Sequence, residues 1–185
     1  MNVIATLFLR AKHWQLFIIS IILFLVEVFV VRPHLSVVGS PALISGAETA
    51  IDVVFLLAWV WSAGLFLNSI VQPSLRLNLP LFYFSLILPV LLFAWLAPWL
   101  VPNDHSPLAL VQTGLRVLAF VCTIYAIGFV ADLLIRAETG RPAPFIEVAG
   151  QFLLIWFFVI GVWFIQPRVN RLYAERMRGS TAPSL

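Results

Sequence analysis

The strongest constraint on the fold is an uninterrupted apolar segment at residues 79–101. Its sequence, LPLFYFSLILPVLLFAWLAPWLV, contains no charged residue. A bilayer core about 30 Å thick is crossed by about 20 helical residues, so this segment is long enough to span a membrane. Its Leu, Ile, Val and Phe side chains favour insertion by roughly 4–8 kcal/mol. We therefore predict a transmembrane helix here.

The rest of the chain has the same apolar character. Of its 185 residues, 62% are hydrophobic and 10% are charged, whereas soluble domains are about 45–50% apolar and about 25% charged. This composition excludes a water-soluble enzyme, a nucleic-acid-binding protein and a disordered chain. We expect an integral membrane protein that contacts membrane lipids and no nucleic acid.

Five apolar stretches are long enough to cross a membrane, and we predict an all-α, polytopic bundle of five transmembrane helices. Backbone amides in lipid need internal partners, and the alternating pattern of a membrane barrel is absent, so helices are favoured. Residues 1–185 then form a single transmembrane domain. The basic tail at residues 168–185 is expected to be disordered. The predicted spans are residues 14–31, 51–71, 79–101, 113–135 and 145–165.

The basic residues leave the orientation of the chain open. Cytoplasmic segments carry an excess of Lys and Arg, but with five spans each face of the membrane receives five such residues. Either the tail lies outside, or four spans plus a re-entrant segment place both ends inside. We favour five spans with the N-terminus inside. One face then carries Arg10, Lys12, Arg76, Arg136 and Arg141, and the other carries Arg32, Arg168, Arg171, Arg176 and Arg178.

Polar side chains within the spans are the first candidates for a functional site. Glu27, Asp132, Glu147 and Gln151 could line a path for a proton or a cation. Each of the acids also has a structural explanation, which we favour. Asp132 can pair with Arg136 four residues later on the same helix. Glu147 lies near a helix N-terminus, where the helix dipole stabilises a carboxylate, and Glu27 can pair with a neighbouring arginine.

Three tryptophans, Trp59, Trp61 and Trp156, lie well inside the predicted spans rather than at the interfaces. We expect them to pack between helices. A buried indole N–H needs a hydrogen-bond acceptor, and the polar residues within reach along the spans are Asn68, Gln112 and Gln151.

A second polar group, formed by Gln166, Arg168 and Asn170, lies where the last predicted span ends. Pro167 is predicted to stop the helix at this point. The planar guanidinium of Arg168 can bind a phosphate or a carboxylate. The group could therefore capture a lipid headgroup or an acidic segment of a partner, although a helix stop with an interfacial arginine is the simpler explanation.

The sequence contains no recognisable catalytic or metal-binding motif, and we expect no cofactor. Its three histidines lie at span ends, so they do not suit a haem within the membrane. We therefore expect a non-enzymatic accessory or scaffold subunit that contacts lipid, a membrane-protein partner or a second copy of the chain. A small transporter or channel that uses the intramembrane polar residues is the alternative.

Two motifs resemble a group of small bacterial multi-pass membrane proteins of unassigned function. These motifs are KHWQLF at residues 12–17 and WFIQPRVN at residues 163–170. The resemblance implies a location in the bacterial cytoplasmic (inner) membrane and implies no activity. A helix-breaking proline would be expected near position 159 in such proteins. Val159 stands there instead, which favours an unbroken helix over residues 145–165.

Overall fold

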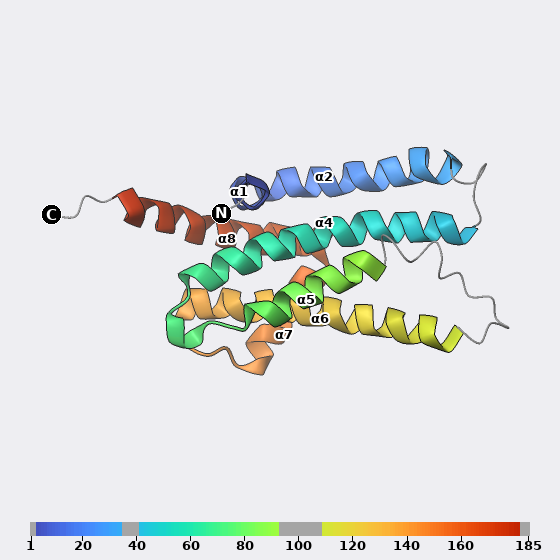
Figure 1. The fold of residues 1–185 in the computed structure, drawn as a ribbon. Coiled ribbons are helices and arrows are strands. Elements are labelled where there is room, and N and C mark those ends of the chain that lie inside the picture. The colour runs from blue at the N-terminus through green and yellow to red at the C-terminus, as the bar shows by residue number, and fades with distance from the viewer. Residues whose placement is uncertain (1–2, 35–40, 93–108, 182–185) are drawn as a thin grey trace. The chain divides into compact units, whose positions relative to one another are not determined.

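The computed structural model describes residues 3–34, 41–92 and 109–181, and these residues form helices joined by short turns (Figure 1). No strand occurs among them, so the all-α prediction is confirmed for the part of the chain that is described. In order, the helices are α1 (Val3–Arg10), α2 (His13–Val26), the π-helical turn η1 (Glu27–Val31), α4 (Pro41–Ile70), the 3₁₀ turn η2 (Pro73–Leu75), α5 (Leu79–Val90), α6 (Ala109–Thr139), α7 (Phe145–Trp156) and α8 (Phe158–Thr181).

Three helical segments of the described chain are long and apolar enough to cross a membrane: His13–His34, Val53–Ile70 and Thr113–Thr139. The count rises to four if the bent pair α7 and α8 is taken as one span. The five spans predicted from the sequence are not confirmed. Of the predicted span at 79–101, α5 is apolar but covers 12 residues, and positions 93–101 lie outside the described residues.

The predicted fifth span is wrong as a single helix, because it is broken at Phe157. The φ and ψ angles of Phe157 are −88° and 58°, so its backbone leaves the helical region. Its N–H still donates to Leu153 O at 2.9 Å, while its carbonyl accepts from the N–H groups of Ile160 and Gly161 at 3.0 and 2.8 Å. One residue therefore ends α7 and begins α8, and the two helices are bent by 119°.

A close backbone contact accompanies the bend between α7 and α8. A Cβ atom added at Gly161 would lie 1.5 Å from the carbonyl oxygen of Leu154. This separation is far below any van der Waals contact, so no residue with a side chain fits at this position without a shift of the backbone. We refer to α7 and the apolar start of α8, residues 145–165, as the hairpin.

The predicted helix stop at Pro167 is also wrong, and the tail that was expected to be disordered is helical as far as Thr181. Pro167 lies inside α8, which continues to Thr181. A proline inside a helix removes one backbone hydrogen bond, but packing compensates for this loss here. Val162, Ile165, Val169 and Leu172 recur every three or four residues and are all buried, as expected of a helix that docks through one apolar face.

The helices divide into two compact units. Unit 1 contains α1, the first turns of α2, the second part of α4 from Trp59, the end of α6 from Ile127, and all of α7 and α8. Unit 2 contains the remainder of α2, the first part of α4, α5 and the first part of α6. The core of unit 1 surrounds Trp59 and Leu67 of α4, and that of unit 2 surrounds Phe82 of α5.

Candidate functional site

The most deeply placed polar side chain described in unit 1 is Gln166, which is fully buried on α8. Its Oε1 accepts a hydrogen bond of 2.8 Å from Nε1 of Trp59 on α4. Its Nε2 lies 2.9 Å from each of three acceptors, namely Phe8 O, Ala11 O and Asn170 Oδ1. The amide of Gln166 therefore joins α8 both to α4 and to the N-terminal helix α1.

Asn170, one turn after Gln166 on α8, strengthens the same connection. Its Nδ2 donates to Ala11 O at 3.0 Å. The predicted headgroup-binding residues Gln166 and Asn170 thus direct their amides at the backbone where α1 ends. Burial and these hydrogen bonds give Gln166 a structural role, and a lipid headgroup does not reach a side chain that is fully covered.

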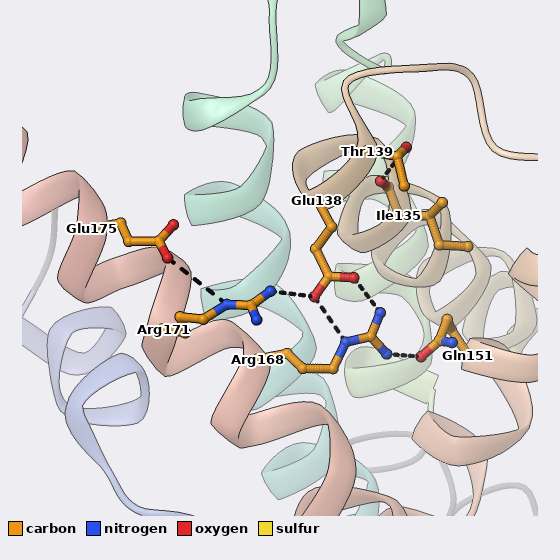
Figure 2. A network of polar contacts seen from close by, with 7 residues as sticks. All are labelled: Ile135, Glu138, Thr139, Gln151, Arg168, Arg171 and Glu175. Carbon is orange, nitrogen blue, oxygen red and sulfur yellow. Dashed lines mark hydrogen bonds and ion pairs between the residues drawn. The ribbon is translucent and has the colours of Figure 1, made fainter.

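Arg168, the third residue of that predicted group, lies at the centre of a network of charged and polar side chains (Figure 2). Its Nε donates to Glu138 Oε1 at 2.8 Å, and its Nη2 contacts Glu138 Oε2. Its Nη1 donates to Gln151 Oε1. Because Glu138 is on α6 and Gln151 is on α7, one guanidinium joins three helices with the two-pronged geometry that suits a carboxylate.

Arg171 extends this network towards the surface. Its Nη2 lies 3.4 Å from Glu138 Oε1, and its Nε lies 3.8 Å from Glu175 Oε1. Figure 2 shows both arginines facing the same carboxylate. Arg168 already binds both carboxylate oxygens of Glu138. The longer contact of the exposed Arg171 with Glu138 therefore compensates the positive charge of Arg171 only in part.

The other predicted intramembrane residues are held in separate pairs. Asp132 accepts from Nε and Nη2 of Arg136 at 2.7 and 2.8 Å, and Nη1 of Arg136 donates to Leu75 O at 3.1 Å. Glu147 accepts from Nη2 of the exposed Arg141 at 2.7 Å. The predicted pairing of Asp132 with Arg136 is confirmed. Asp132, Glu147 and Gln151 each contact a different arginine.

Glu27 belongs to unit 2, where it begins the π-helical turn η1. Its side chain is buried, at 8% exposure. Turns of this kind are rare and occur mostly as single insertions within α-helices. Among the described residues, no group of three or more His, Cys, Asp or Glu side chains is placed to hold a metal ion.

The hairpin exposes a set of large apolar side chains on both of its arms. The tip residue Phe157 is 60% exposed and Ile160 is 64% exposed. Exposed apolar clusters of this kind mark surfaces that contact lipid or another protein. The set comprises Phe145, Ile146, Leu153, Trp156, Phe157, Val159, Ile160, Trp163 and Phe164.

Sequence reasoning missed one member of this site, Glu138, and one contact, that of Trp59 with Gln166. Glu138 lies just beyond the predicted fourth span and so escaped the search for intramembrane acids, although α6 in fact continues to Thr139. The acceptor for Trp59 is Gln166 rather than Asn68, Gln112 or Gln151. Asn68 instead accepts from the backbone N–H of Leu77 at 3.0 Å.

Comparison with known proteins adds no further constraint: no family model, no curated protein and no solved structure matches the chain.

Proposed function

We propose that the chain is a non-enzymatic accessory or scaffold protein of the bacterial cytoplasmic membrane. In this proposal the hairpin is re-entrant, dips into one leaflet, and contacts lipid or a membrane-protein partner through its exposed apolar side chains. The observation that carries the proposal is the 119° bend at Phe157, which returns the chain towards the end of α1.

The lengths of the two arms support a hairpin that does not cross the membrane. The 12 residues of α7 rise about 18 Å at 1.5 Å per residue, and the apolar start of α8 at residues 158–165 rises about 12 Å. Each arm is much shorter than a hydrocarbon core of about 30 Å. Either arm alone reaches at most about 60% of the way across the hydrocarbon core.

The contacts of Gln166 and Asn170 with α1 support the same topology. Both amides lie within 3.0 Å of Ala11 O, which immediately precedes the first membrane helix. With five spans, the start of the first span and the end of the last would lie on opposite faces of the membrane. Four crossings, by the predicted spans at residues 14–31, 51–71, 79–101 and 113–135, would place both on one face.

The distribution of charge is consistent with this arrangement. Nine of the eleven Lys and Arg residues fall within unit 1. Under the re-entrant topology their segments share one face, which the positive-inside rule assigns to the cytoplasm. The basic residues are then no longer divided equally between the two faces, as they are with five spans. The nine are Arg10, Lys12, Arg76, Arg136, Arg141, Arg168, Arg171, Arg176 and Arg178.

A transporter or channel, the alternative function, receives less support from the same contacts. A polar path needs side chains that converge on one hydrated cavity. Asp132, Glu147 and Gln151 are each engaged by a different arginine. These separate contacts give no single group of polar side chains that could line a path, which favours the accessory or scaffold role.

Site-specific photo-crosslinking in the native membrane tests the proposed role of the hairpin. A benzophenone amino acid placed at Phe157 or Ile160 is expected to give discrete adducts to a membrane protein, or strong adducts to lipid. The same probe at Ile165, which is 1% exposed, is expected to react only within the chain. The exposed Ile22 of α2 controls for general contact with acyl chains.

The proposal fails if neither hairpin position gives intermolecular adducts. It also fails if Phe157 and Ile160 give the same adducts, in the same yield, as Ile22, because the hairpin would then be an ordinary lipid-facing surface. Discrete protein adducts from the hairpin alone would identify a partner.

A further inference from the structure

The two terminal helical segments together carry a group of exposed cations that the proposed function does not use. Arg10 and Lys12 flank the junction between α1 and α2, and Arg171, Arg176 and Arg178 lie on α8. All five side chains are exposed. We refer to these five residues as the terminal basic surface.

Hydrogen bonds described above bring the two parts of this surface together. Ala11 lies between Arg10 and Lys12, and its carbonyl oxygen accepts from Asn170, the neighbour of Arg171. Figure 1 shows α1 beside α8, in agreement with their direct contacts. Cations at both ends of the sequence therefore lie on adjoining elements of unit 1.

Acidic side chains near the terminal basic surface do not neutralise it. Glu138 is held through both oxygens by Arg168 and lies 3.4 Å from Arg171. Glu175 lies 3.8 Å from Arg171, which is at the outer limit of an ion pair. Two of the described carboxylates thus face Arg168 and Arg171, so the terminal basic surface keeps an excess of positive charge even when Arg178 is left out of the count.

Apolar side chains border these cations. Ile4 and Leu7 of α1 are 56% and 64% exposed, although Ala5 and Leu9 on the other side of the same helix are buried. Trp14, at the start of α2, is also exposed. A short amphipathic helix next to cations and an interfacial tryptophan is the arrangement found at the headgroup level of a bilayer.

We propose that the terminal basic surface binds the headgroups of anionic phospholipids, with α1 lying in the interface so that Ile4 and Leu7 contact the acyl chains. This inference rests on the proposed function, in which both terminal segments share one face of the membrane. Arginine side chains bind phosphate oxygens as a two-pronged donor, and the adjoining apolar residues select a lipid over a free anion.

Lipid retention by the full chain in a non-ionic detergent, followed by native mass spectrometry, tests this inference. The wild type is expected to retain phosphatidylglycerol in preference to phosphatidylcholine. In the triple variant Arg10→Gln, Arg171→Gln, Arg176→Gln this preference is expected to fall about a hundredfold, since each exposed cation contributes about fivefold to association with an anionic surface.

A second triple variant provides a control with the same change in net charge. It carries Arg32→Gln, Arg116→Gln and Arg141→Gln, which lie outside the terminal basic surface. In the proposed topology Arg32 and Arg116 are on the other face of the membrane, and Arg141 is paired with Glu147 at 2.7 Å. This variant is therefore expected to keep the preference within about twofold. Thermal unfolding followed by tryptophan fluorescence confirms that both variants are folded. If the first variant unfolds, Arg176→Gln alone is measured, with an expected decrease of about fivefold.

Three results would overturn the inference. They are equal retention of the two lipids by the wild type, an equal loss of preference in the control variant, and displacement of phosphatidylglycerol by inorganic phosphate, which would indicate a site for a free anion. Photo-crosslinking at Phe157 does not depend on these arginines. Loss of lipid preference with intact hairpin adducts would therefore reject this inference and leave the proposed function standing.

Discussion

At the scale of single residues, the buried amide of Gln166 is the polar group in unit 1 that contacts the most partners among those described above. It connects the indole of Trp59 with two backbone carbonyls of the α1 segment. We expect Gln166→Leu to destabilise the protein by about 2–4 kcal/mol, because it leaves buried polar groups without partners. This loss corresponds to a decrease in Tm of roughly 5–10 °C for a chain of this size.

Thermal unfolding in detergent, monitored by tryptophan fluorescence, measures this decrease. The matched control is Gln72→Leu, since Gln72 is an exposed glutamine of the same unit whose side chain does not cap the 3₁₀ turn η2. A Gln166→Leu protein as stable as the control would show that the buried amide contributes little.

The sequence predicted the side-chain contact between Asp132 and Arg136 correctly, because both residues lie on one helix. Asp132 and Arg136 are four residues apart, and a helix brings such side chains together whatever the tertiary structure is. The partner of Trp59 lies 107 residues away in the sequence. No local spacing encodes that pairing, because it depends on how α8 packs after the bend.

At the scale of elements, Gly161 determines whether the hairpin can form. We expect Gly161→Ala to disrupt the contact of α8 with α7, because the added Cβ would lie 1.5 Å from Leu154 O. Gly150→Ala is the matched control: it lies in α7, nothing is within 4 Å of its added Cβ, and alanine stabilises a helix by about 1 kcal/mol relative to glycine.

Hydrogen exchange measured by mass spectrometry over residues 157–161 distinguishes the two variants. The amides of Ile160 and Gly161, which donate to Phe157 O, are expected to lose protection in Gly161→Ala and to keep it in Gly150→Ala. Unchanged protection in both would contradict the close approach of the two helices.

The existence of most helices was predictable from the sequence, but the break in the last one was not. Apolar runs indicate where helices lie, because lipid requires every backbone amide to be satisfied within the segment. The break occurs at Phe157, which has no special conformational preference. Pro167 was predicted to end the helix, but α8 continues past it. The residues before and after the proline that hold this helix in place are buried on one face, namely Val162, Ile165, Val169 and Leu172. A search of the sequence for apolar residues every three or four positions would have predicted that the helix continues into the tail.

At the scale of the whole molecule, the re-entrant topology makes a prediction about sidedness. Single cysteines are introduced into a Cys122→Ala background at Leu7, Leu110 and Ala174, all of which are exposed, and are labelled with an impermeant maleimide in intact spheroplasts and in inverted vesicles. We expect Leu7→Cys and Ala174→Cys to react from the cytoplasmic face and Leu110→Cys to react from the other. Five spans would instead place Ala174 with Leu110.

The equal division of basic residues between two faces followed directly from assuming five crossings. The positive-inside rule is a statistical bias in short loops, so it cannot detect a segment that enters and leaves on one face. Local composition gives the position of apolar segments. Whether a segment crosses depends on its bend and on its long-range contacts, neither of which appears in a hydropathy pattern.

The hydrogen bonds between Ala11 and the amides of Gln166 and Asn170 also set an order of events during biosynthesis. Ala11 is 155 and 159 positions away from Gln166 and Asn170 in the sequence, so these bonds of the α1 segment cannot form until α8 has been synthesised. Contacts with such long sequence separation form late. Quality-control proteases that act on unassembled membrane proteins would therefore meet an α1 segment without these bonds for as long as α8 is not in place.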